Sequence, residues 1–155
     1  MLPTFSEGEM VYMGGYEARI EGVERGDVVV FGFGKSDSGG VVGGEANVLG
    51  GVSDEYLFIK RVIGVPGDRV VIRDGGVEVN GKMLSEPYSR GETKIDSFEN
   101  PIMSADAQGI VYNVPAGKYF VLGDNREASV DSRNFVGTYV DGAEVCGKLV
   151  VGVWR

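Results

Sequence analysis

The sequence contains no histidine and only one cysteine among its 155 residues. The absence of histidine excludes Ser-His-Asp and Cys-His catalysis and removes a main ligand of the common zinc sites. A single cysteine, Cys146, cannot form a disulfide within the chain, and its apolar neighbours predict a small buried side chain. We therefore predict no metal site and no cofactor. Any hydrolytic chemistry must use Lys, Asp, Glu or Ser.

Long apolar runs and clusters of basic residues are also missing. No stretch of about 20 apolar residues occurs, so the chain as given is not expected to span a membrane. Its first five residues have neither the basic nor the long apolar region of a targeting peptide. The net charge is −8 and the basic residues are scattered, which argues against nucleic-acid binding because that requires grouped Lys and Arg side chains.

Glycine and short β-branched runs are abundant instead. The chain has 26 glycines, and its apolar runs are short and end at glycine or other turn residues, which is typical of strands. No window has a convincing helical period. We therefore predict an all-β fold, or very nearly so, with a tight hairpin turn at Asn80-Gly81. The expected strands cover residues 27–31, 56–63, 69–73, 77–79, 110–112, 118–122 and 148–154.

One segment interrupts this pattern. Residues 84–109 are polar and irregular, contain Pro87 and Pro101, and have few β-branched residues. They fit a small cap-like excursion from the main sheet better than a separate domain. We predict a single domain over residues 1–155, with a core formed by residues 1–83 and 110–155.

The run from Phe58 to Asp68 contains a lysine in an apolar strand. Because side chains alternate between the two faces of a strand, Lys60 shares a face with Phe58 and Val62. Burial favours the neutral form of a lysine, and a neutral amine can act as a general base without histidine. The alternative is an edge lysine whose ammonium reaches water while its stem packs. Taken alone, this segment favours the alternative.

A second polar segment, Gly123–Arg133, directly follows an expected strand. Its small polar residues predict a tight loop held by its own hydrogen bonds. Asp131 and Arg133 could pair and hold the loop, while Ser129 could orient another group. Taken alone, a polar connecting loop explains the segment equally well.

Together with the first residues, these segments are similar to the motifs of bacterial type I signal peptidases. The family's nucleophile motif Ser-Met-x-Pro-Thr-Leu matches residues 1–5, with Phe5 in the leucine place. Its base motif Lys-Arg-x-x-Gly-x-Pro-Gly-Asp matches residues 60–68, and Gly-Asp-Asn-x-x-x-Ser-x-Asp-Ser-Arg matches residues 123–133. The family's Gly-Asp-Val-Val-Val-Phe strand matches residues 26–31. The chain therefore resembles the extracytoplasmic catalytic domain of this family, in its compact Gram-positive form.

This resemblance implies a mostly antiparallel, coiled β-sheet core and a Ser/Lys serine endopeptidase. Such an enzyme removes signal peptides from secreted preproteins after small residues (Ala-x-Ala), at the extracytoplasmic face of the bacterial plasma membrane. Its partners would be signal peptides and the membrane surface, with no nucleic acid. The implied site residues are Lys60 as general base and Ser129 as the group that orients it, Met1, Phe5, Phe58 and Ile59 for substrate binding, and Pro3, Thr4, Asp124, Asp131 and Arg133 for structural support.

The nucleophile itself is missing from the sequence as given. The family's serine falls at the position directly before Met1, and its membrane anchor normally lies further upstream. Losing the oxyanion donors of that stretch would alone cost about 10²–10³ in rate. We therefore expect this chain as given to be inactive.

Two other interpretations stay open. The chain could be a module that captures extended peptides without cleaving them, which the missing serine favours and the intact Lys60 and Ser129 oppose. It could also be a self-cleaving repressor-type Ser/Lys protease on a related β-fold. The complete runs at residues 60–68 and 123–133 oppose that second interpretation.

Overall fold

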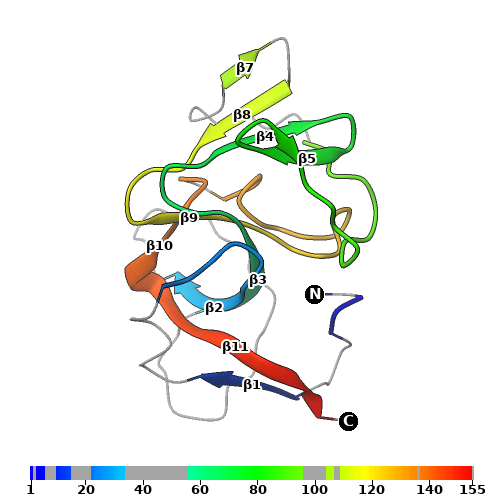
Figure 1. Ribbon diagram of the computed structural model, residues 1–155. Coiled ribbons are helices and arrows are strands. Elements are labelled where there is room, and N and C mark those ends of the chain that lie inside the picture. Colours follow the sequence, from blue (N-terminus) through cyan, green and yellow to red (C-terminus); the bar gives the residue numbers. More distant parts are fainter. Residues whose placement is uncertain are drawn as a thin grey trace.

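The computed structural model describes residues 1, 3–5, 10–14, 22–33, 56–95, 104–106, 109–135 and 137–154, which form two antiparallel sheets (Figure 1). The six-stranded sheet has the order β1-β11-β2-β3-β9-β10, and the five-stranded sheet has the order β6-β5-β4-β8-β7. The chain crosses between the sheets at the turns from β3 to β4 and from β8 to β9. The strands are β1 (Met10–Gly14), β2 (Val28–Phe33), β3 (Tyr56–Gly64), β4 (Arg69–Arg73), β5 (Gly76–Val79), β6 (Lys82–Met83), β7 (Ser104–Asp106), β8 (Gly109–Asn113), β9 (Lys118–Leu122), β10 (Val140–Asp141) and β11 (Val145–Trp154).

The predicted all-β, mostly antiparallel fold is confirmed. Within the described residues, the only helical turn is the 3-10 helix η1 (Gly142–Glu144). Each strand expected from the sequence is present. The sequence did not predict β1, β6, β7 and β10, which are five residues long or shorter. β6, β7 and β10 have three residues or fewer, which gives too few alternations for a period of two to be recognised.

The predicted hairpin turn at Asn80-Gly81 is confirmed. It joins β5 to β6, and both residues have positive φ angles, 52° at Asn80 and 80° at Gly81. These values suit a two-residue hairpin, whose central positions need the left-handed conformation. Asp74 and Gly75, with φ of 52° and 74°, form the same kind of turn between β4 and β5.

Two hydrophobic clusters lie on opposite faces of β3 and β9. The neighbours Val62 and Ile63 belong to different clusters, and so do Phe120 and Val121. This separation follows from the alternation of side chains along a strand. One cluster is called the Phe31 cluster below; it consists of Val29, Phe31, Phe58, Val62, Val121, Phe135, Val140 and Val145.

The prediction that Cys146 is buried is wrong. Cys146 is exposed, although its neighbours Val145 and Gly147 are buried. Along β11 the alternation directs the neighbours inward and Cys146 outward, so apolar neighbours in sequence do not imply burial in a strand.

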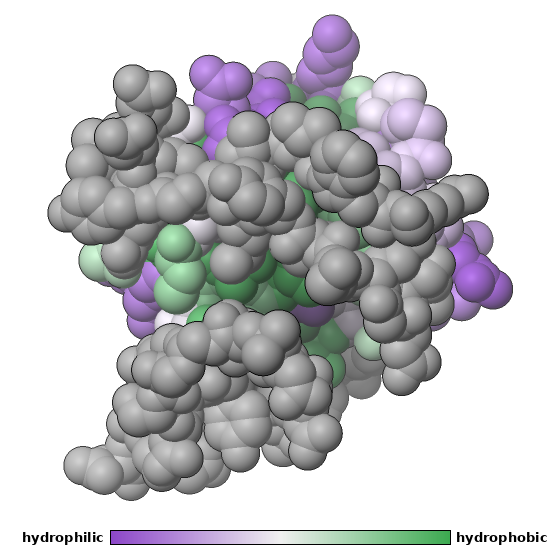
Figure 2. Space-filling view, turned by 90° about the horizontal axis from the view of Figure 1, so that it is seen from below, coloured by the Kyte–Doolittle hydropathy of each residue, from purple (hydrophilic) through white to green (hydrophobic). Residues whose placement is uncertain are grey.

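Seen from below, hydrophobic described residues gather at the centre of the visible face and hydrophilic ones at its margin (Figure 2).

Candidate active site

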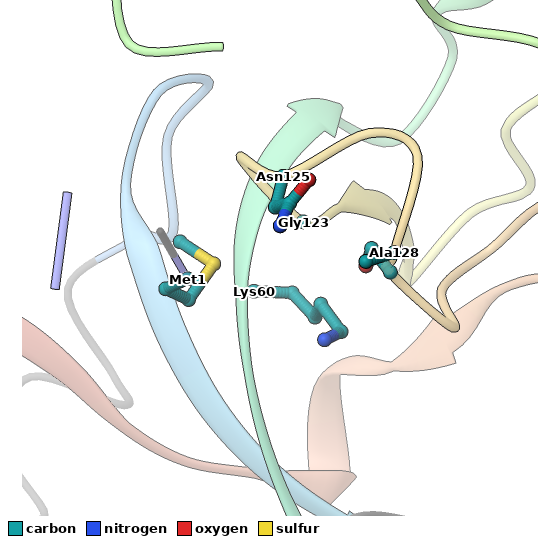
Figure 3. Close-up of a pocket in the computed structure, with 6 residues that line it drawn as sticks. Met1, Lys60, Gly123, Asn125 and Ala128 are labelled. Atoms are coloured by element: carbon teal, nitrogen blue, oxygen red, sulfur yellow. The ribbon is translucent and has the colours of Figure 1, made fainter. Parts of the chain in front are cut away.

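A small pocket lies between β3 and the loop that follows β9. Its volume is about 120 Å³, and it is lined by Met1, Lys60, Gly123, Asn125, Ala128 and Ser129. Figure 3 shows the Lys60 side chain extending from β3 toward the loop that carries Gly123, Asn125 and Ala128. The pocket therefore brings together residues from all three motifs found in the sequence: one from the first, one from the second and four from the third.

The alternation of β3 explains the surroundings of Lys60. Phe58 and Val62, two residues before and after it, both belong to the Phe31 cluster. On the neighbouring strand Lys60 is paired with Val29, which is fully buried. Burial lowers the pKa of the Lys60 ammonium; the nearby charge of Asp131 opposes this shift, and that of Arg133 adds to it. Lys60 is thereby shifted toward the neutral amine that a general base requires.

A buried ion pair gives the loop its shape. Asp131 is fully buried, and its two carboxylate oxygens accept hydrogen bonds from Arg133 Nε at 2.8 Å and Arg133 Nη2 at 2.9 Å. Asp131 also accepts from the backbone N–H of Gly123 at 3.0 Å. Arg133 in turn donates to the carbonyl oxygens of Arg126 and Lys94. The pair thus ties both ends of the loop to each other.

Ser129 lies in the pocket without the predicted hydrogen bond to Lys60. Its Oγ is buried and has no hydrogen-bond partner in this structure. Instead, Ser129 packs against Gly123: a Cβ atom added to Gly123 would lie 2.1 Å from Ser129 Oγ and 2.5 Å from Ser129 Cβ. The structure therefore places Ser129 beside Lys60 and leaves its hydroxyl with an unused hydrogen-bonding capacity.

A second ion pair attaches the N-terminal residues to the site. Asp124 is fully buried and accepts from Arg61 Nε at 2.9 Å and Arg61 Nη2 at 2.8 Å, while Thr4 Oγ1 donates to the same carboxylate. Burial disfavours the charge on Arg61, but the hydrogen bond and the charge of Asp124 outweigh it and raise the pKa of Arg61. Thr4 thereby connects the segment that begins at Met1 to the loop after β9, which forms one wall of the pocket.

Known proteins with similar sequences and structures share one description. The family described as signal peptidase, peptidase S26, matches residues 1–154. The chain belongs to the signal peptidase family. Signal peptidase IB of Staphylococcus aureus (strain Mu50) is 35% identical over 162 residues, covering 99% of this chain and 73% of the relative. Signal peptidase I of Bacillus licheniformis is 35% identical over 147 residues, covering 95% and 68%.

A solved structure of a related enzyme supports the same assignment. The signal peptidase I of Enterococcus faecalis V583 is 31% identical and superimposes with a TM-score of 0.53, covering 84% of this chain and 98% of the other. No helix in the part of this signal peptidase that the structure describes is long and apolar enough to cross a membrane.

The four residues predicted to bind substrate lie in different surroundings. Met1 lines the pocket, and Ile59 is half-buried on β3. Phe5 is buried, and Phe58 packs in the Phe31 cluster, its ring 5.7 Å from that of Phe31 and 5.5 Å from that of Phe135. Phe58 is therefore a core residue that supports the strand beneath the pocket. Pro3 is exposed and directly precedes Thr4, whose hydrogen bond to Asp124 is partly buried.

Sequence reasoning missed a group of residues from the polar segment after β6. Glu86 accepts two hydrogen bonds from Arg126, and the guanidinium carbon of Arg61 lies 4.1 Å from the centre of the Tyr88 ring. Arg61 and Arg126 belong to the matched motifs, but Glu86 and Tyr88 lie in an irregular stretch without a periodic pattern. The only available signal was that Arg61 and Arg126, which are partly and fully buried, require partners for their charges.

Substitution of Gly123 by alanine is expected to disturb the pocket, because the added methyl group has no room beside Ser129. Overpacking of this kind costs about 1–3 kcal/mol in the free energy of unfolding. Thermal unfolding of Gly123→Ala and of the double variant Gly123→Ala/Ser129→Gly checks this. The double variant removes the clashing Cβ and Oγ atoms, and we expect it to regain most of the stability. Equal stabilities of wild type and Gly123→Ala would contradict the packing seen here.

Proposed function

We propose that this signal peptidase removes signal peptides with a Ser/Lys dyad, in which Lys60 is the general base and a serine directly before Met1 is the nucleophile. The observation that carries the proposal is the shared pocket of Met1 and Lys60. Burial and the charge of Lys60 lower the pKa of the Met1 amine. A preceding residue would be bonded to that nitrogen, and its side chain would begin next to Lys60.

The proposed reaction has two halves, formation and hydrolysis of an acyl-enzyme, and each half needs a proton acceptor. Neutral Lys60 takes the proton from the serine hydroxyl as the serine oxygen attacks the carbonyl carbon of the scissile bond. The Lys60 ammonium then returns the proton to the leaving amine as the peptide C–N bond breaks, which leaves an acyl-enzyme. A water molecule, deprotonated by Lys60, then attacks this ester, and the Lys60 ammonium returns the proton to the serine oxygen as the acyl C–O bond breaks, which regenerates the serine and the neutral amine. The burial that lowers the pKa of Lys60 supports this role.

In this scheme Ser129 is a positioning residue for Lys60. Its buried hydroxyl has no partner, and a buried polar group without a hydrogen bond carries a cost of about 1–3 kcal/mol. A hydrogen bond to the Lys60 amine would remove that cost and orient the lone pair of the amine toward the serine. Asp131 and Arg133 would support this arrangement by holding the loop.

The substrate would bind as an extended strand alongside β3. The pairing of β9 with β3 begins at Arg61, so among the described strands the part of β3 that leads to Lys60 pairs with β2 alone. An extended peptide can add to a sheet edge through backbone hydrogen bonds, and small pockets then select its side chains. A pocket of about 120 Å³ suits a small residue such as alanine. We assign the activity to the extracytoplasmic face of the bacterial plasma membrane.

A cleavage assay tests this function. A chain with a serine placed directly before Met1 is expected to cut a peptide that carries Ala-x-Ala, whereas the chain beginning at Met1 is not. The rate should rise with pH because the neutral fraction of Lys60 increases as the ammonium loses its proton. It should level off above the lowered pKa of Lys60, below the pH at which an ordinary lysine titrates.

Two results would contradict the proposal in different ways. A flat pH profile from mildly acid to alkaline pH would exclude a neutral-amine base. Binding of the peptide without cleavage by the serine-bearing chain would instead favour a peptide-binding module. Mass spectrometry of the incubated peptide distinguishes these cases, because cleavage products appear in the first case and not in the second.

A further inference from the structure

The segment Glu86–Thr93 lies directly on the loop that forms one wall of the pocket. The backbone N–H of Arg90 donates to the carbonyl oxygen of Asp124 at 2.7 Å, and that of Arg126 donates to the carbonyl of Arg90 at 2.9 Å. Arg90 and Asn125 form an isolated parallel bridge. In Figure 1 this stretch after β6 runs beside the loop after β9. The segment and the pocket wall are therefore joined through their backbones.

Glu86 and Arg126 form a buried ion pair within this contact. Arg126 Nη1 and Nη2 donate to the two oxygens of Glu86 at 3.0 and 2.7 Å, and the two side chains are 1% and 8% exposed for Arg126 and Glu86. Arg126 also donates to Thr93 Oγ1 at 2.6 Å and, through Nε, to the carbonyl oxygen of Gly123 at 3.1 Å. Because Gly123 lines the pocket, the guanidinium links Glu86 to the pocket wall.

Tyr88 connects the same segment to β3. Its ring covers the guanidinium of Arg61 at 4.1 Å, a distance typical of a cation–π contact. Its hydroxyl donates to Glu86 Oε1 at 3.1 Å. Burial and the neighbouring charge of Glu86 raise the pKa of Tyr88 to about 12, so the hydroxyl keeps its proton and remains a donor. Arg61 directly follows Lys60 in β3 and holds Asp124, which directly follows Gly123.

We propose that Glu86 and Tyr88 are positioning residues for the proposed reaction, and that the segment Glu86–Thr93 acts as a clamp across the two walls of the Lys60 pocket. Tyr88 holds the β3 wall through Arg61, Glu86 holds the loop wall through Arg126, and the Tyr88–Glu86 hydrogen bond joins the two. None of these side chains lines the pocket, so the clamp acts indirectly: it fixes the distance between the two walls of the pocket. This inference rests on the proposed function, because it assumes that Lys60 works as a dehydrated base.

The physical consequence of opening the clamp follows from the burial of Lys60. If the walls of the pocket separate, water reaches the Lys60 amine. Burial, which is the main cause of its lowered pKa, is then weaker, and the pKa rises toward that of an ordinary lysine. The charged groups that act on Lys60, namely Asp131, Arg133, Asp124 and the Met1 amine, are unchanged by substitutions in the clamp. A change in the titration of Lys60 would therefore report hydration and geometry rather than the loss of a neighbouring charge.

The test compares four variants in the chain as given and in the serine-bearing chain. Tyr88→Leu removes the ring from Arg61, whereas Tyr88→Phe keeps the ring and loses only the hydroxyl. Because Glu86→Gln leaves Arg126 buried without its counter-charge and can prevent folding, it is replaced by the double variant Glu86→Gln/Arg126→Gln. Glu92→Gln is the matched control in the same segment, because the Glu92–Lys94 ion pair is exposed and such pairs contribute little.

The titration of Lys60 is followed by NMR in the chain as given, with carbon-13-labelled lysine and Lys60→Arg for assignment. We expect the Lys60 midpoint to move up most in Tyr88→Leu and in the double variant. It should move up by less in Tyr88→Phe, which loses the hydrogen bond to Glu86 but keeps the ring over Arg61, and stay at the wild-type value in Glu92→Gln. In the serine-bearing chain, kcat at neutral pH should fall about 10- to 100-fold for the first two variants, with KM nearly unchanged and part of the loss recovered at alkaline pH.

The clamp is refuted if Tyr88→Leu and the double variant titrate like Glu92→Gln, even if their melting temperatures fall. A loss of kcat that is the same at all pH values, with an unchanged Lys60 midpoint, would also refute it. The NMR titration does not depend on cleavage. A serine-bearing chain that cuts no peptide would thus overturn the proposed function while the clamp is still judged from the Lys60 midpoint.

Discussion

Replacement of Lys60 by alanine is expected to abolish cleavage by the serine-bearing chain, with a loss of about 10⁴-fold, at the upper end of what a positioned proton acceptor contributes. Among the described residues that line the pocket, only Lys60 has a side chain that titrates as a base. The others are Met1, Gly123, Asn125, Ala128 and Ser129. Without the amine, none of the described residues that line the pocket has a side chain that can take the proton of the serine hydroxyl. Single-turnover cleavage of an Ala-x-Ala peptide measures the effect.

Two further variants separate chemistry from folding. Lys60→Met keeps an unbranched side chain of similar length against Phe58 and Val62 but has no amine, so we expect unchanged or higher thermal stability and no cleavage. Lys82→Ala, on the exposed strand β6, is the control and should cleave at the wild-type rate. Cleavage by Lys60→Ala at more than a few per cent of the wild-type rate would exclude the dyad.

Asp131→Asn is expected to cause the largest loss of stability, about 3–5 kcal/mol in the free energy of unfolding. The substitution leaves the Arg133 guanidinium, which is 6% exposed, without its counter-charge. It also replaces one acceptor of the Arg133 hydrogen bonds by an amide, which cannot accept through both of its polar atoms. For a chain of this length the loss corresponds to a decrease in Tm of about 10 °C. Differential scanning calorimetry of the chain as given measures it.

The double variant Asp131→Asn/Arg133→Gln removes both charges and should be more stable than Asp131→Asn alone, because the unpaired buried charge is the main cost. Lys94→Gln, which breaks the exposed ion pair with Glu92, is the matched control and should change the stability by less than about 1 kcal/mol. A Tm of Asp131→Asn close to that of Lys94→Gln would mean that the pair does not hold the loop.

Much of the fold could be predicted because strands leave a local signature. Alternation in residues 56–63 placed Phe58 and Val62 on one face, and both belong to the Phe31 cluster. Paired turn residues predicted the hairpin at Asn80-Gly81. These features depend on neighbours within a few residues, so the sequence alone contains them. Short strands such as β7 and β10 lack that signature, because they form only where a longer strand provides hydrogen-bond partners.

The candidate site was predicted less completely. The resemblance to signal peptidases implied that Lys60 and Ser129 would meet, and both line the pocket. It did not predict that Ser129 Oγ would pack against Gly123 without a hydrogen-bond partner, because that depends on the path of the loop between them. Nor did it predict that Phe58 packs against Phe31 and Phe135 in the core; the substrate contact expected for Phe58 stays a prediction.

The sequence by itself determined the all-β class, the exclusion of histidine chemistry, and the strand and loop that carry Lys60 and Ser129. These follow from composition and from periods of a few residues, which are local properties of the chain. The tertiary structure alone decided which buried charges meet, as in the pairing of Glu86 with Arg126 across 40 positions and of Arg61 with Asp124 across 63. Such pairs form because a buried charge requires a partner, and the fold determines which partner is within reach.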